Sequence, residues 1–204
     1  SLGLPLSEHS FVLRTVNSKI HQFQLGKMTI DSVKYLTAPH FLEKQVDGLF
    51  CMEGSINYSR ELSRLVYTYQ FRNQFICSDT NLTVLYRGKT IDTIHTAQIQ
   101  VKQIHPGVYT LSAPPLIVNK RARVSGKYLF IQSALRADNE DESILKRASD
   151  IDVYDLTSGA YQCSFYLFNQ GAGPLLDFYI SRQTLIALHD HYLFRYILDP
   201  HFFR

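Results

Sequence analysis

The stretch "SDIDVYDLTSGAYQCSFYLF", residues 149–168, contains two alternating segments separated by a turn. Ile151 and Val153 alternate with polar residues, and residues 161–167 repeat the same two-residue period, which is typical of half-buried β-strands. Asp155 and Gly159 favour the turn, because aspartate accepts backbone hydrogen bonds locally and glycine adopts a positive φ without steric cost. An isolated hairpin is only marginally stable in water, so this one predicts neighbouring strands.

Similar strand openings recur along the chain. Aligning Phe11, Leu65, Leu129 and Leu185 gives spacings of 54, 64 and 56 residues. Repeats of four strands and ~40–50 residues, lengthened by insertions, are the signature of propeller blades. The sequence therefore predicts an all-β fold of repeated antiparallel meanders, a partial β-propeller of about four blades, forming a single domain over residues 1–204. A β-sandwich is the alternative, but the strand-to-strand turns are short and no long crossover is obvious.

Composition agrees with strands and argues against several partners. Aromatic residues make up 13% of the 204 residues, and the net charge of +3 is dispersed. The one basic cluster, at residues 120–123, is short, so we expect no nucleic-acid partner. No apolar run reaches the ~18 residues of a membrane span, so no transmembrane segment is predicted. Residues 139–149, "NEDESILKRAS", read as an exposed loop with one helical turn.

The cysteines and polar clusters predict no catalytic residue, no metal and no cofactor. Cys51, Cys77 and Cys163 lie far apart in apolar contexts, which favours buried free thiols, although an exported protein could form one disulfide. His189-Asp190-His191 reads better as a turn than as a metal site. The acidic run at Asp138, Glu140, Asp141 and Glu142 lacks the pattern of a calcium loop. Asp150 and Asp152 are expected to face solvent or tie a turn.

Several segments resemble a known family over about residues 45–198. They include "RLVYTYQFRNQFICSDTNLTVLYRGKTIDTI" from Arg64, "PPLIVNK", "YLFIQSALRADNEDE" and "DIDVYDLTSGAYQCSFYL". The sequence is similar to uncharacterised bacterial six-bladed β-propellers, TolB-like or NHL-like, which are often exported lipoproteins. The resemblance implies a periplasmic or cell-surface location but no activity. Six blades need at least ~240 residues, so we expect the C-terminal portion of a longer propeller. Unpaired blade edges then predict self-association. A closed four-bladed propeller is the alternative.

Candidate binding residues are those expected on channel-lining strands or on one propeller face. This set suits a sugar or peptide better than a metal: Arg14, Tyr67, Tyr69, Gln132, Ser133, His189 and His191. The functional hypothesis is a non-enzymatic binding or scaffold module of the bacterial cell envelope, with an unknown protein, peptide or carbohydrate as ligand. The alternatives are a metal-dependent hydrolase of the propeller lactonase type, and a structural protein whose sheet edge pairs with another chain.

Overall fold

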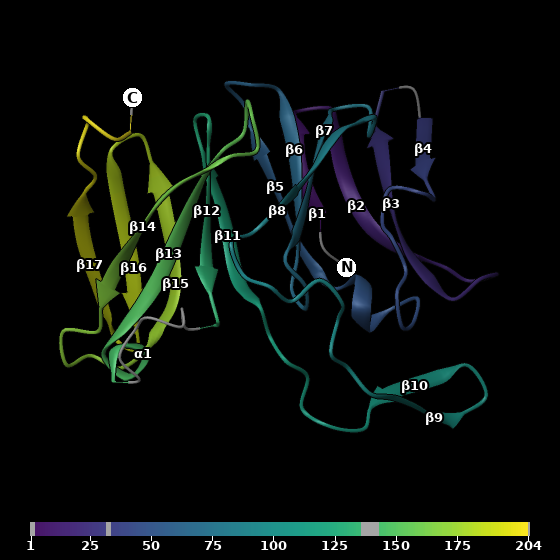
Figure 1. The fold of residues 1–204 in the computed structure, drawn as a ribbon. Coiled ribbons are helices and arrows are strands. Elements are labelled where there is room, and N and C mark those ends of the chain that lie inside the picture. Colours follow the sequence, from purple (N-terminus) through teal and green to yellow (C-terminus); the bar gives the residue numbers. More distant parts are fainter. Residues whose placement is uncertain (1–2, 32–33, 136–142, 204) are drawn as a thin grey trace. The chain divides into compact units, whose positions relative to one another are not determined.

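The computed structural model describes residues 3–31, 34–135 and 143–203, and almost all of its regular structure is β-strand (Figure 1). The all-β prediction is confirmed. The chain divides into two compact units, residues 1–119 and 120–204, which are described separately below. The prediction that residues 1–204 form a single domain stays a prediction.

The N-terminal unit contains two four-stranded antiparallel sheets, each with its strands in chain order. The first sheet consists of β1 (Gly3–Ser7), β2 (Ser10–Asn17), β3 (Gln22–Thr29) and β4 (Lys34–Ala38). The second consists of β5 (Gly54–Ser59), β6 (Arg64–Tyr69), β7 (Gln74–Asp79) and β8 (Val84–Lys89). A 3-10 turn, η1 (Phe50–Met52), precedes β5, and a hairpin of β9 (Val101–His105) and β10 (Val108–Leu111) follows β8.

The C-terminal unit contains one four-stranded and one three-stranded antiparallel sheet, again in chain order. The third sheet consists of β11 (Asn119–Ser125, starting at the last residue of the first unit), β12 (Tyr128–Ser133), β13 (Ala148–Asp155) and β14 (Tyr161–Phe168). The fourth consists of β15 (Leu175–Ser181), β16 (Thr184–His189) and β17 (Tyr192–Ile197). A single helical turn, α1 (Ile144–Arg147), precedes β13, as predicted. The acidic run before it lies outside the described residues.

The repeat is real. Phe11, Leu65, Leu129 and Leu185 each occupy the second residue of the second strand of their sheets, in β2, β6, β12 and β16. Each sheet is a meander of consecutive strands, and no strand of the described residues pairs outside its own meander. This arrangement is that of propeller blades and not of a sandwich, whose strands cross between two sheets.

The hairpin of residues 149–168 forms as predicted, from β13 and β14. Thr157 N–H donates to the Asp155 carboxylate at 2.6 Å, and Gly159 has φ of 76°. Although burial acts to raise the pKa of Asp155, hydrogen bonds from Thr157 and Ser158 outweigh it and lower the pKa. The turn is therefore held by the residues that the sequence analysis identified.

One prediction about this hairpin is wrong. Strand β13 is buried on both faces and is not half-buried. Asp150 and Asp152 do not face solvent: both are buried, and the Asp152 carboxylate accepts a hydrogen bond from Ser164 Oγ at 2.5 Å. The physical reason is position, because β13 pairs with β12 on one side and β14 on the other and both of its faces are covered.

Each unit buries its own apolar cluster between its two sheets. The first cluster joins Val12 and Leu25 to Leu65, Tyr67 and Tyr69. The second joins residues of the third sheet to residues of the fourth and to Leu198 just after it: Phe130, Ile151, Val153, Leu167, Leu175, Phe178, Ile180, Leu185, Ala187 and Leu198. No helix among the described residues has the length and apolar character needed to cross a membrane. All three cysteines are free; Cys51 and Cys77 are buried and Cys163 is half-buried.

A matched pair of phenylalanines on the third sheet tests this arrangement. Phe130 is 1% exposed and Phe168 is 46% exposed. Phe130→Ala should lower the free energy of unfolding by about 3–5 kcal/mol, because it removes a ring and leaves a cavity. Phe168→Ala should cost less than about 1 kcal/mol. Urea unfolding followed by circular dichroism measures both, and equal losses would contradict the described burial.

Candidate functional site

Arg14 and Tyr67 form the best-connected polar cluster among the predicted residues. Arg14 Nη1 lies 2.6 Å from the Glu53 carboxylate and donates to Tyr67 Oη and to the Gly54 carbonyl, both at 3.2 Å. The Tyr67 hydroxyl donates to the Met52 carbonyl at 2.5 Å. The cluster therefore ties β2 and β6 to the η1–β5 segment.

The protonation states in this cluster follow from burial and pairing. Burial alone would lower the pKa of Arg14, but the neighbouring Tyr67 and Glu53 outweigh it and raise the pKa. Burial raises the pKa of Tyr67 far above its ordinary value, and the attraction of Arg14 offsets this only in part. Arg14 is thus charged and paired with Glu53, while Tyr67 is neutral. This combination suits a structural tie, since the pKa values of both Arg14 and Tyr67 are raised further away from neutral pH.

Tyr69 lies beside Tyr67 and carries a second buried arginine. The two tyrosine rings pack edge to face with centroids 5.2 Å apart. The Arg72 guanidinium carbon lies 3.5 Å from the centroid of the Tyr69 ring, and Arg72 Nη2 donates to the Glu43 carbonyl at 3.1 Å. Arg72 is only 1% exposed, and its Nη1 has no hydrogen-bond partner. Sequence reasoning missed this residue; its only signal was the "FRNQF" stretch at residues 71–75.

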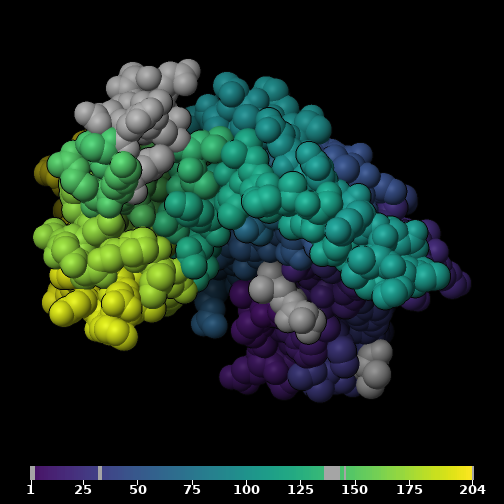
Figure 2. Space-filling model, turned by 90° about the horizontal axis from the view of Figure 1, so that it is seen from below, coloured from purple at the N-terminus to yellow at the C-terminus, as the bar shows by residue number. Residues whose placement is uncertain are grey.

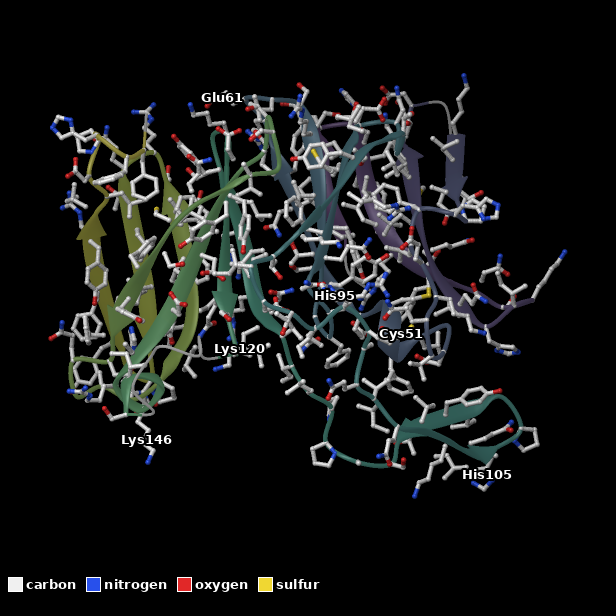
Figure 3. The ribbon with its side chains drawn as sticks, in the orientation of Figure 1. Cys51, Glu61, His95, His105, Lys120 and Lys146 are labelled. Carbon is white, nitrogen blue, oxygen red and sulfur yellow. The ribbon has the colours of Figure 1, made fainter. Side chains whose placement is uncertain are left out.

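Two loops enclose the turn that carries Arg72. The Asn73 amide oxygen lies 3.0 Å from His95 Nδ1, and Gln45 Nε2 donates to the His95 carbonyl at 3.0 Å. The Gln45 backbone N–H in turn points to Cys51 Sγ at 3.3 Å. Cys51 and His95, labelled in Figure 3, mark the two loops. The polar groups of this region are satisfied mainly by one another, which is how buried polar groups are held in structural cores.

The predicted residues of the C-terminal unit each bond to a different partner and not to one another. Gln132 is buried on β12 and donates to Ser149 Oγ at 3.1 Å. Ser133 Oγ donates to the Leu135 carbonyl at 3.1 Å in the turn that follows. His189 is buried on β16, its Nδ1 lies 3.0 Å from the Gly173 carbonyl, and its Nε2 has no partner. His191 is exposed, 3.6 Å from the Asp190 carboxylate.

The two histidines therefore do not form a joint ligand pair. Asp190 between them has φ of 41°, a turn conformation. The part of the chain that the structure describes holds no group of three or more His, Cys, Asp or Glu residues placed to bind a metal.

Five of the predicted residues share a position in their sheets. Arg14, Tyr67, Tyr69, Gln132 and His189 all lie on the second strand of a sheet. In the N-terminal unit the first strands, β1 and β5, also contact one another across the two sheets. The structure brings together Arg14, Tyr67 and Tyr69 and none of the others. Whether any of the predicted residues binds a ligand stays a prediction.

A groove in the C-terminal unit has the character of a ligand site. It has a volume of about 330 Å³ and lies between β14 and residues 196–203, which are the end of β17 and the chain that follows it. Its lining is mostly apolar and aromatic: Cys163, Ser164, Phe165, Tyr166, Leu167, Tyr196, Ile197, Leu198, Asp199, Phe202 and Phe203. The last residues of the chain, yellow in Figure 2, lie at the surface of this unit.

The chain's own end closes part of the groove. The Phe203 ring packs against Tyr128 and Phe130, with centroids 5.7 Å away in both cases, and against Phe165 at 6.3 Å. The Tyr128 hydroxyl donates to the Phe202 carbonyl at 3.1 Å. The Tyr196 hydroxyl is buried in the lining and has no hydrogen-bond partner. Mainly apolar walls with a few polar groups are typical of small-ligand and peptide sites.

Sequence reasoning did not identify this groove. Its signals were two aromatic clusters, "FYLF" at residues 165–168 and "HFF" at residues 201–203. The first was interpreted only as strand, and the second was not interpreted. Their proximity depends on how the third and fourth sheets stack.

The strand order defines a β-propeller-like protein. No family model matches the sequence, and no curated protein matches it. Among solved structures, a member of the DUF4221 family from Bacteroides vulgatus is similar at 10% identity with a TM-score of 0.48, over 100% of this chain and 58% of that one. The chain thus spans little more than half the length of that protein.

Two further structures are similar at lower scores. A prolyl endopeptidase has 8% identity and a TM-score of 0.38, over 93% of this chain and 32% of that one. The β-propeller domain of Swd1 from Myceliophteria thermophila has 13% identity and a TM-score of 0.36, over 95% and 68%. The description of the sheets as blades rests on their strand order and not on these similarities.

Because the Tyr67 hydroxyl is buried, the free energy of unfolding should depend on pH in the alkaline range. Because burial raises the pKa of Tyr67 in the folded chain, the resulting stabilisation is present below the unfolded value of about 10 and is lost as the pH rises above it. Tyr67→Phe should reduce the fall in unfolding free energy between pH 9 and pH 11 by about 1 kcal/mol. Urea unfolding at the two pH values measures this slope.

The control for this experiment is Tyr109→Phe. Tyr109 is an exposed tyrosine on β10, so Tyr109→Phe shows the effect of removing a phenol hydroxyl outside the buried cluster. A Tyr67→Phe slope equal to that of the wild type would show that Tyr67 ionises normally in the folded chain.

Proposed function

We propose that this chain is a non-enzymatic binding module, and that the groove between β14 and residues 196–203 receives apolar side chains of a peptide or protein ligand. The observation that carries the proposal is the composition of the groove walls. Phe165, Leu167, Ile197, Leu198 and the two terminal phenylalanines are apolar, and few polar groups interrupt them. A carbohydrate site needs several convergent hydrogen-bond groups, so the groove favours a peptide over a sugar.

The polar groups of the groove determine where a bound ligand can place its own polar atoms. The Tyr196 hydroxyl has no partner and is free to bond one polar atom of a bound segment. Asp199 already accepts the His201 N–H at 2.8 Å, which orders the turn below the groove. The ligand that fits best is therefore mainly apolar with a polar backbone or hydroxyl atom near Tyr196.

The hydrolase alternative receives no support from a specific observation at this groove, whose only carboxylate is Asp199. Calcium analysis of the purified protein separates the two functions, because a stoichiometric ion would favour the hydrolase.

The proposal also includes membership of a six-bladed bacterial propeller family and a place in the cell envelope, supported by the sequence resemblance alone. Fractionation of expressing cells tests the location.

A small apolar probe tests the groove directly. N-acetyl-phenylalaninamide should bind with a millimolar dissociation constant and shift the NMR signals of groove residues. Methyl methanethiosulfonate attaches a blocking group to Cys163, while Cys51 and Cys77 are shielded by burial. Burial and the nearby Asp152 raise the pKa of the Cys163 thiol, so labelling should be done above pH 8. The block should weaken binding at least tenfold, and dithiothreitol should restore it.

The matched control moves the thiol by one residue, to a position on the same strand that does not line the groove. Gln162 is exposed on β14 and does not belong to the residues that line the groove. In the Gln162→Cys, Cys163→Ser variant, the same reagent should leave binding unchanged. Binding that ignores the block at Cys163, or shifts confined to other regions, would refute the groove as the ligand site.

A further inference from the structure

Among the described residues the fourth sheet has three strands, whereas the first three sheets have four each. In the first three sheets the fourth position is filled by β4, β8 and β14. In the fourth sheet, among the described residues, β17 pairs with β16 only, and Figure 1 shows it at the outer edge of its sheet. An edge strand of this kind presents backbone donors and acceptors to any extended segment that can pair with it.

The register identifies which residues of β17 point outward. Leu198 N–H donates to the Gln183 carbonyl at 2.8 Å, on the side of β16. Backbone groups of an antiparallel strand alternate between its two sides. The N–H and C=O groups of Leu193, Arg195 and Ile197 therefore point away from β16, toward the open edge.

The side chains of these three residues form a defined pattern. They pair across the sheet with Leu188, Ile186 and Thr184, so all lie on one face. Leu193 is 71% exposed and Ile197 is 61% exposed, and Tyr179 and Ile186 extend the apolar surface. Arg195 is the cation of β17 itself, and none of the ion pairs found within the described ranges involves it. The edge therefore presents apolar, cationic and apolar side chains in turn.

This pattern disfavours a second copy of the same strand. Two copies of β17 could pair antiparallel with each other. Only one register would give backbone hydrogen bonds to all three outward residues, and it sets Leu193 opposite Ile197 and Arg195 opposite Arg195 of the second copy. Like charges directly opposite one another destabilise a sheet pair. A segment with a carboxylate opposite Arg195 has no such penalty.

The other face of an added strand would lie beside the groove. Tyr192, Phe194 and Tyr196 alternate with the outward residues and point to the face that packs on the third sheet. A strand added to β17 would place its alternate side chains next to Tyr196, whose hydroxyl has no partner. The inference thus rests on the proposed function and extends it from the groove to the sheet edge.

We propose that β17 is a strand-addition site for an extended segment of a partner protein with the alternating pattern apolar, any residue, Asp or Glu, any residue, apolar. The segment pairs antiparallel with Leu193, Arg195 and Ile197 through backbone hydrogen bonds. Its carboxylate lies opposite Arg195, its two apolar residues cover Leu193 and Ile197, and its intervening residues face Tyr196 and the groove.

A short peptide tests the site. The labelled peptide Lys-Val-Thr-Glu-Thr-Val-Lys is palindromic, so it presents the same side chains in either strand direction. It should bind the wild-type chain in fluorescence anisotropy, and about five- to tenfold more weakly when its Glu is replaced by Lys. N-methylation of the Glu should abolish binding, because it removes a backbone donor from the ladder. Raising the salt concentration should shrink the Glu-to-Lys difference.

A charge exchange provides the decisive comparison. Arg195→Glu should reverse the preference, so that the Lys peptide binds better than the Glu peptide. Arg147→Glu, an equal charge change at an exposed position on α1, should keep the wild-type preference. Equal binding of both peptides to the wild type, or indifference to N-methylation, would overturn strand addition at β17. So would a chain that dimerises in sedimentation experiments while ignoring the peptides, since a second copy would then occupy the edge.

The two proposals fail separately. If N-acetyl-phenylalaninamide binds the groove but the peptide does not bind, strand addition is wrong and the groove remains a ligand site. If the peptide binds with the charge dependence given above while the groove probe does not bind, the edge is the binding element and the groove function is wrong.

Discussion

The structure depends on the stacking of thin sheets, because none of these meanders can bury its apolar side chains alone. Strands β6 and β13 show this most clearly, since they are buried along nearly their whole length on both faces. In each unit the apolar cluster is shared between two sheets. A single meander would expose one side of every such strand, and at roughly 25 cal/mol per Å² of apolar surface the loss would exceed the stability of a typical domain.

Stacking also explains the unusual polar interior. Side chains on the second face of a central strand are buried whether or not they are apolar, so polar ones must find partners there. Asp152 is satisfied by Ser164, and Arg14 by Glu53 and Tyr67. Within the described part of the chain Arg72 is held without a carboxylate, by the Glu43 carbonyl, the Gln74 amide and the face of the Tyr69 ring. Such groups cost more to leave unpaired than they contribute when paired, so they specify one arrangement of the loops around them.

The same physics sets the limit of what the sequence could predict. Strand periodicity and turn residues are local, so the hairpin at residues 149–168 and the repeat through Phe11, Leu65, Leu129 and Leu185 were predictable. Burial of Asp150 and Asp152 was not, because the covering of a strand's second face is a tertiary property. For the same reason the alternation of polar and apolar residues in β13 was misread as one solvent-facing side. The groove was missed because Phe165 and Phe203 are distant in sequence and meet only through packing.

The fourth sheet differs from the others in the one respect that matters for association. The last strand of a meander leaves one edge of the sheet unpaired. Proteins protect such edges against further strand pairing with charged residues, twist or short strands. Strand β17 carries a single charge, Arg195, between two exposed apolar residues. One cation is enough to disfavour pairing with an identical strand, yet it leaves the backbone open to a segment of opposite charge. In the proposed strand addition, protection against self-pairing and selection of a partner come from the same side chain, because both depend on the sign of the charge placed opposite it.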